Sequence, residues 1–241
     1  MSTHNQRPAP IVLVHGAWLG GWVWRDVVPV LRTAGHPVFA PTLTGLGERA
    51  HLGSAATDLD THIQDIANVL HYEDLRDVRL VGHSYAGMVI SGVAERAAEQ
   101  IGRLIYLDAF VPASGEAMHD LVTAEEVQRN RELARAIGDG WRMPPLGEVR
   151  TGTPERNHWA NARLTPQSLA TYEQAITLTK SLPEIARIYI QCTQKSADDI
   201  FIRYARQTAA DPAWQFRAFA GDHMAMVSVP EKLAALLLDI I

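Results

Sequence analysis

The fold of this chain is decided by the stretch VRLVGHSYAGM, residues 78–88. Its first four residues have the apolar character of a short buried strand, and the residues after Gly87 are expected to form a helix. Ser84 stands on the turn between them, with small residues two positions away on either side; Ala86 replaces the usual second glycine. This is the pattern of a nucleophile elbow, which lifts a serine hydroxyl above a sheet. The alternative is that Ser84 only caps the helix, because serine is a favoured N-cap residue.

A second strand runs into a glycine-containing loop in the stretch IVLVHGAWLGGW, residues 11–22. In acyl-transfer sites of this kind, one oxyanion-hole N–H comes from such a loop and another from the residue after the serine. We therefore expect the backbone N–H groups of Ala17 and Tyr85 to form the oxyanion hole. A phosphate-binding loop is disfavoured, because the stretch has neither a Gly-Lys-Ser/Thr ending nor a Gly-x-Gly-x-x-Gly pattern.

A histidine near the C-terminus completes the pattern. The stretch GDHMAM, residues 221–226, follows the strand-like residues 214–219 and precedes a helix expected near 229–240. A loop after the last strand is where this order of motifs, serine first and histidine last, places the general base. His223 is therefore the candidate base for Ser84.

These three stretches resemble the plant methylesterase and hydroxynitrile lyase branch of the α/β-hydrolases. They resemble bacterial esterases of the same branch more closely still, including pyrethroid-hydrolase-like proteins, and TLTGLGER, residues 42–49, also matches those bacterial esterases. The resemblance implies a serine hydrolase that cleaves carboxylic esters of small, largely apolar substrates through an acyl-serine intermediate, without a cofactor. The lyases of that branch carry a lysine after the histidine, whereas this chain has Met224, as the esterases do. A lactonase or cyclase and a non-catalytic ligand receptor on the same fold are open alternatives.

The acid of the triad is where this chain departs from the plant pattern. Lys195 stands where the plant members carry an aspartate, and a cation cannot orient an imidazole. Asp108 ends an apolar strand that is expected to lie beside the strand carrying Ser84. Functional groups collect at the carboxyl ends of such strands, so Asp108 is predicted to hydrogen-bond His223.

Other aspartates lie close enough in the sequence to compete for this role. Asp198 and Asp199 are the alternative acids, but they directly precede a helical run and are better explained as its caps. Asp222 precedes the candidate histidine, and because adjacent side chains seldom face each other we interpret it as a turn residue.

Strands and helices alternate along most of the chain, which predicts an α/β class: a minimal α/β-hydrolase fold with a six-stranded, mostly parallel sheet and helices on both faces. The expected strands lie near residues 11–15, 37–40, 78–83, 103–108, 186–192 and 214–219, and the expected helices near 22–34, 58–71, 85–98, 198–208 and 229–240. The alternation fails between Pro112 and Pro183, where helical runs at 124–137 and 166–179 are separated by glycines and prolines. We therefore predict an inserted helical lid at 112–183 and a hydrolase core formed by 1–111 and 184–241.

Five residues are candidates for substrate binding: Trp18, Tyr85, Trp141, Trp159 and Met224. Trp18 directly follows the expected oxyanion donor Ala17, and Met224 directly follows the candidate base His223. The Tyr85 ring is expected to form a wall of the pocket. The two lid tryptophans are expected to line an apolar pocket, although burial in the lid's own core explains either of them alone.

Composition narrows the class of protein. The net charge of −5 over 241 residues argues against a nucleic-acid partner, and no apolar run approaches the roughly 20 residues of a membrane helix. No histidines and carboxylates have metal-ligand spacing, so we expect no metal. The single Cys192 and a polar segment at residues 1–10 favour a reducing, cytoplasmic setting. The expected partner is a small-molecule ester, and a homodimer is left open.

Overall fold

A computed structural model describes residues 8–179 and 185–241. Within these ranges, six parallel strands form one sheet in the order β2-β1-β3-β4-β7-β8. The strands are β1 (Ile11–Val14), β2 (Val38–Phe39), β3 (Val78–His83), β4 (Ile101–Leu107), β7 (Ala186–Cys192) and β8 (Trp214–Phe219). The predicted fold class is confirmed, and each neighbouring pair of strands in this sheet is parallel. All strands therefore end at the same edge, where the candidate site residues follow them.

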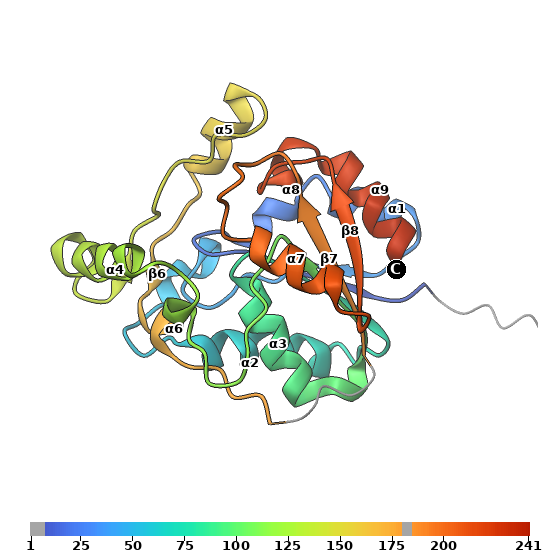
Figure 1. Cartoon of the computed structure of the whole chain (residues 1–241), viewed down its shortest axis with the longest axis horizontal. Helices are drawn as coiled ribbons and strands as arrows, with labels where there is room; N and C mark the ends of the chain where they lie inside the picture. The colour runs from blue at the N-terminus through green and yellow to red at the C-terminus, as the bar shows by residue number, and fades with distance from the viewer. Residues whose placement is uncertain (1–7, 180–184) are drawn as a thin grey trace, which may run out of the picture.

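Helices cover both faces of the sheet (Figure 1). One face packs against α1 (Val28–Thr33), α8 (Ala225–Ser228) and α9 (Pro230–Ile240), and the other against α2 (Leu59–Tyr72), α3 (Ala86–Ala97) and α7 (Ile202–Ala210). Short 3-10 helices occupy Gly21–Trp24, Gly47–Leu52, Ala98–Gln100 and Met118–Asp120. The central strands β1, β3 and β4 are largely buried, as expected from their apolar runs, whereas the edge strand β8 is partly exposed.

The helix expected at 22–34 is divided into two pieces. A 3-10 helix ends at Trp24, and α1 starts only at Val28, with Pro29 in its first turn. Proline is favoured at the start of a helix and disfavoured in its interior, so Pro29 marks a start rather than a continuation. The prediction of one continuous helix was wrong at this point.

The inserted segment contains α4 (Ala124–Ile137), α5 (Pro154–Asn161), α6 (Ala170–Glu173) and a two-stranded antiparallel sheet of β5 (Arg142–Met143) and β6 (Gln167–Ser168). The helical run at 124–137 is confirmed. The prediction of a helix at 166–179 was wrong. Within this range β6 pairs with β5. Beyond α6, the N–H of Ile176 donates a 2.9 Å hydrogen bond to the carbonyl of Glu116, and its carbonyl accepts a 2.8 Å bond from the N–H of Gly115. Pairing with distant parts of the chain has overridden the local helical preference.

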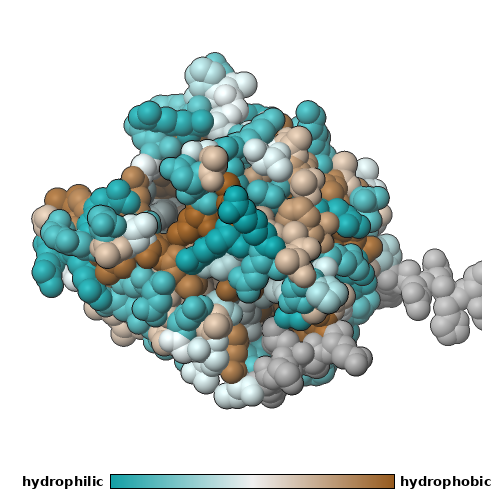
Figure 2. Space-filling view, viewed as in Figure 1, coloured by the Kyte–Doolittle hydropathy of each residue, from teal (hydrophilic) through white to brown (hydrophobic). Residues whose placement is uncertain are grey.

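The inserted segment projects from the core, with α4 and α5 at its outer ends (Figure 1). The face seen in Figure 2 is largely hydrophilic, and hydrophobic side chains gather in a recess between the α4 region and the core. The C-terminal boundary predicted for the lid, residues 183 and 184, lies outside the described residues, as do residues 1–7 of the polar N-terminal segment. No helix in the described ranges is long and apolar enough to cross a membrane.

Candidate active site

Ser84 lies on a sharp turn between β3 and α3. Its φ of +55° is in the left-handed region, which few non-glycine residues adopt. The turn has no room for larger neighbours: a Cβ added at Gly82 would lie 2.8 Å from the carbonyl oxygen of Ala86, and one added at Gly87 would lie 1.9 Å from the carbonyl oxygen of Phe110. Glycine is therefore required at both positions by the close approach of the backbone.

Asp108 and His223 are brought together although 115 positions separate them. Asp108 directly follows β4 and is completely buried, with a φ of +45°. His223 lies in the loop between β8 and α8. The Nδ1–H of His223 donates a 2.7 Å hydrogen bond to Oδ2 of Asp108. The predicted contact between the relocated acid and the histidine is thus present.

The competing aspartates have other partners. The Asp199 carboxylate accepts a 2.9 Å bond from the backbone N–H of Phe201 ahead of α7, and Asp198 accepts from the Ser196 hydroxyl. Asp222 accepts a 2.8 Å bond from the N–H of Met224 and a bond from the Thr151 hydroxyl. These contacts agree with the interpretation of all three as turn or capping residues.

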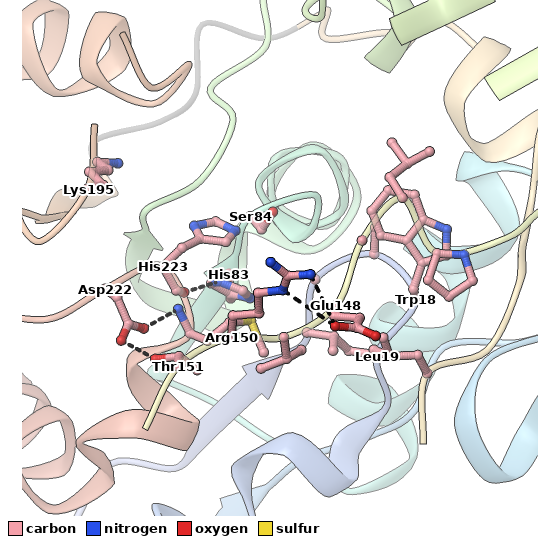
Figure 3. Close-up of a pocket in the computed structure, with 18 of the residues that line it drawn as sticks. Trp18, Leu19, His83, Ser84, Glu148, Arg150, Thr151, Lys195, Asp222 and His223 are labelled. Carbon is pink, nitrogen blue, oxygen red and sulfur yellow. Dashed lines mark hydrogen bonds and ion pairs between the residues drawn. The ribbon is translucent and has the colours of Figure 1, made fainter. Parts of the chain in front are cut away.

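Ser84 and His223 line the same cavity, and Figure 3 shows the serine hydroxyl beside the imidazole. Within the described part of the chain no hydrogen bond joins the two side chains. Nucleophile–base contacts in ligand-free sites are often long and shorten when substrate binds. The imidazole face is fixed by Phe201, whose ring stacks on it with centroids 4.8 Å apart and an interplanar angle of 14°.

The two predicted oxyanion donors are free to bind a ligand. Neither the N–H of Ala17 nor that of Tyr85 has a hydrogen-bond acceptor among the described residues. Ala17 lines the cavity, and Tyr85 is the residue immediately before α3, where the positive end of the helix dipole lies. Negative charge that develops beside Ser84 would therefore be stabilised by both the donors and the helix.

The cavity has a volume of about 400 Å³. Its apolar wall combines core residues with residues of the inserted segment: Trp18, Leu19, Leu146, Val149, Leu164 and Met224. Charged side chains lie at its border: Glu148, Arg150, Lys195 and Asp222. An apolar chamber of this size with a few polar groups suits a small, largely apolar molecule.

Two of the substrate-binding candidates lie outside this cavity, which corrects the expectation for them. The ring of Trp159 packs edge-on against Trp22 at 5.1 Å and is flanked by the Arg25 and Arg163 guanidinium groups at 4.6 and 4.8 Å. Trp141 instead has the Arg142 guanidinium over its ring at 5.1 Å. Both rings are used in packing outside the cavity, which is the alternative that the sequence left open.

The Tyr85 ring is also placed differently from the expectation that it would wall the pocket. It is completely buried and stacks on Tyr172, with centroids 5.7 Å apart and planes within 4°. Its hydroxyl lies 3.0 Å from Nδ1 of His62, whose Nε2–H donates to the carbonyl of Thr44, so the tyrosine is the donor in this pair. Burial raises the pKa of the Tyr85 hydroxyl above its ordinary value. Only the backbone of Tyr85 is available to the site.

His83 supports the loop that carries His223, a role that the sequence did not reveal. Its Nε2–H donates a 2.8 Å hydrogen bond to the backbone carbonyl of His223. Burial, aided by the proximity of His223, drives the pKa of the His83 imidazole well below its ordinary value, so this ring is neutral near pH 7. A neutral donor holds the loop without adding a second positive charge next to the candidate base.

Lys195 is the second residue whose role the sequence did not reveal. Its Nζ lies 2.5 Å from Oδ1 of Asp108 and 3.0 Å from Oδ1 of Asp199. Burial alone would raise the pKa of the Asp108 carboxyl, but the hydrogen bond from His223 and the charges of His223 and Lys195 together hold it below its ordinary value. Asp108 is therefore ionised near pH 7. The cation at the position of the plant acid is an ion-pair partner of the relocated acid.

No cluster of three or more His, Cys, Asp or Glu side chains that could hold a metal ion is found within residues 8–179 and 185–241. Burial raises the pKa of the Cys192 thiol above its ordinary value, so this side chain is a poor nucleophile. The candidate catalytic groups that the fold brings together are Ser84, His223, Asp108 and the two free N–H groups.

This fold is shared by a large class of proteins. Residues 11–236 match the family described as the alpha/beta hydrolase family, and the chain belongs to that family. This confirms the resemblance that the sequence motifs indicated.

Two proteins of similar sequence are named as an esterase and a hydrolase. The chain is 41% identical to a carbendazim hydrolyzing esterase of Nocardioides sp. (strain SG-4G), over 95% of this chain and 99% of the relative. It is 27% identical to a pyrethroid hydrolase of Sphingobium wenxiniae, over 95% of this chain and 86% of the relative. Among solved structures, an extracellular alpha/beta-hydrolase from a Paenibacillus species superimposes with a TM-score of 0.85 at 24% identity, covering 96% of this chain and 98% of the other. This last likeness shows the fold.

Proposed function

We propose that this protein is a serine esterase that hydrolyses carboxylic esters of small, largely apolar substrates through an acyl-serine intermediate. The observation that carries the proposal is the 2.7 Å hydrogen bond from His223 to the buried Asp108, because His223 lines the same cavity as Ser84 and Ala17. A hydrolase named as an esterase at 41% identity supports the same reaction class.

The proposed reaction runs in two halves. His223 takes the proton of Ser84 through Nε2 as the serine oxygen attacks the ester carbonyl, and the N–H groups of Ala17 and Tyr85 stabilise the oxyanion. His223 then returns that proton to the leaving alcohol as the ester C–O bond breaks. Water attacks the acyl-serine with His223 again as base, which releases the acid and restores Ser84. Asp108 holds the imidazole tautomer with its proton on Nδ1, and no cofactor is needed.

We further propose that residues 112–183 act as a lid for this site. Leu146, Val149 and Leu164 from this segment line the cavity together with Trp18 and Met224 from the core. The Thr151 hydroxyl donates to Asp222, beside the candidate base, so the segment is tied to the catalytic loop. A lid of this kind excludes water and selects apolar acyl or alcohol groups.

The proposal is tested by comparing hydrolysis with cyanohydrin cleavage. We expect turnover of p-nitrophenyl acetate together with negligible release of cyanide from mandelonitrile, because Met224 follows His223 and lines the cavity where the lyases of this branch carry a lysine. Rates are measured spectrophotometrically for nitrophenolate and colorimetrically for cyanide. Carbendazim and a pyrethroid belong in the same panel as candidate substrates, because relatives are named for them. Cyanide release at the rate of ester hydrolysis would favour the lyase, and no turnover of any ester would favour a binding protein.

The cellular setting remains part of the proposal. Cys192 is buried, and it is the only cysteine in the sequence. This pattern fits a reducing, cytoplasmic environment. One similar solved structure is described as extracellular, so fractionation of the native host is the measurement that decides between the two locations.

A further inference from the structure

Lys195 lines the cavity on the side of His223 that faces away from Ser84 (Figure 3). Its side chain is 7% exposed, although ammonium groups are strongly hydrated and seldom buried without partners. Two carboxylates contact it, Asp108 at 2.5 Å and Asp199 at 3.0 Å, and the ring of Phe201 lies 5.1 Å from its Nζ. The mechanism proposed above assigns no task to this cation.

The contacts of Asp108 show what the cation does to the carboxylate. Oδ2 accepts from His223 at 2.7 Å, while Oδ1 accepts from Lys195 at 2.5 Å and from the backbone N–H of Cys192 at 3.2 Å. A rotation of the carboxylate away from His223 would break bonds to both oxygens. Because Asp108 is completely buried, no water can replace those partners.

The same cation is linked to the imidazole by packing. Phe201 stacks on His223 through one contact and lies under the Lys195 ammonium through another. Asp199 supports this arrangement from the start of the α7 region, since its carboxylate binds both Lys195 and the backbone N–H of Phe201. Lys195 thus lies at the centre of the contacts that fix the acid and the face of the base.

We propose that Lys195 is a positioning residue that fixes the Asp108 carboxylate toward His223 and offsets part of its negative charge. The proposal rests on the esterase function proposed above. In this chain Lys195 occupies the position that holds the acid in the plant proteins. There it would restrain Asp108, which follows the neighbouring strand β4.

The charges of Asp108 and Lys195 determine the direction in which loss of Lys195 should shift the pH dependence of kcat/KM. The Lys195 ammonium offsets part of the negative charge that Asp108 places beside the candidate base. Loss of the ammonium should therefore move the acidic limb of kcat/KM to higher pH. Other titratable or charged groups close to this cluster are Asp199, Asp222, His83, Cys192 and Tyr189.

The test is Lys195→Met, which keeps an unbranched chain against Phe201 and removes the charge. We expect the acidic limb to rise by about one pH unit, and kcat on the plateau to fall about tenfold with little change in KM, because the acid is less well oriented. Lys232→Met on the exposed face of α9 is the matched control and should leave the limb in place. A limb that stays at the wild-type position, or moves to lower pH, would overturn the proposal.

A second variant covers the case in which Lys195→Met does not fold. Asp199→Asn removes the other carboxylate partner of Lys195 while an amide oxygen still accepts from Phe201. The loss of one negative charge should lower the acidic limb by about 0.3 pH unit, and a rise or no shift would contradict the proposal.

The titration of the His223 ring can also be followed by NMR, with His223→Gln to assign its resonance. In a Ser84→Ala background this measurement needs no turnover. An active Ser84→Ala enzyme would refute the esterase mechanism itself, whereas an unshifted ring titration in Lys195→Met would refute only the role of Lys195.

Discussion

Ser84→Ala should reduce kcat for p-nitrophenyl acetate by about 10⁶-fold, the scale found when a serine nucleophile is removed from a triad enzyme. The substitution deletes one oxygen atom on a turn with a φ of +55°, a conformation that alanine and serine tolerate similarly, so the fold should persist. The residual rate would come from the free N–H groups of Ala17 and Tyr85. Initial rates and thermal unfolding, measured on the same preparation, check both parts of this prediction.

The matched control is Ser91→Ala, which removes a buried hydroxyl from α3 and leaves the cavity unchanged. Ser91 bonds the carbonyl of Gly87 at 2.7 Å and the Tyr106 hydroxyl at 2.8 Å. Its loss should cost about 1 kcal/mol of unfolding free energy and leave kcat near the wild-type value. If Ser84→Ala retained a tenth of the activity while Ser91→Ala lost it, the assignment of the nucleophile would be wrong.

Asp108→Asn should lower kcat at least about a hundredfold, and the corresponding change in a serine protease lowers it about 10⁴-fold. The amide oxygen can keep the contact with Lys195, which turns the NH₂ group toward Nδ1 of His223. The imidazole must then accept at Nδ1 and carry its proton on Nε2, where it can no longer remove the proton of Ser84. KM should change little, because Asp108 lies outside the cavity lining.

Asp198→Asn is the matched control for the acid. Asp198 is exposed and bonded only to the Ser196 hydroxyl among the described residues, so its substitution should leave kcat within about twofold and change the thermal stability little. Steady-state kinetics of the two variants decide the matter. A hundredfold loss in Asp198→Asn with normal activity in Asp108→Asn would reverse the assignment.

The sequence predicted those parts of the site that depend on short local motifs. The elbow at Ser84, the donor loop at Ala17 and the histidine after the last strand each need only a strand, a turn and small residues. The contact between Asp108 and His223 could also be predicted, because parallel strands end at one edge and Asp108 follows the strand beside that of Ser84.

The contacts of the site that depend on the direction of a side chain could not be predicted from the sequence. Tyr85 follows the serine directly, yet its ring turns into the core to stack on Tyr172. Trp141 and Trp159 belong to an irregular segment, and only tertiary packing decides which of its aromatic rings reach the cavity. The sequence shows that Lys195 is a cation, but its ion pair with Asp108 depends on the pairing of β4 with β7.

Covalent labelling tests the central claim, a nucleophilic Ser84 activated by His223, most directly. The protein is treated with a serine-directed fluorophosphonate, its intact mass is measured, and the modified peptide is sequenced by mass spectrometry. We predict a single phosphonyl adduct on Ser84, no adduct in Ser84→Ala, and much slower labelling in His223→Gln. An adduct on another residue, or an unlabelled enzyme that still hydrolyses esters, would contradict the claim.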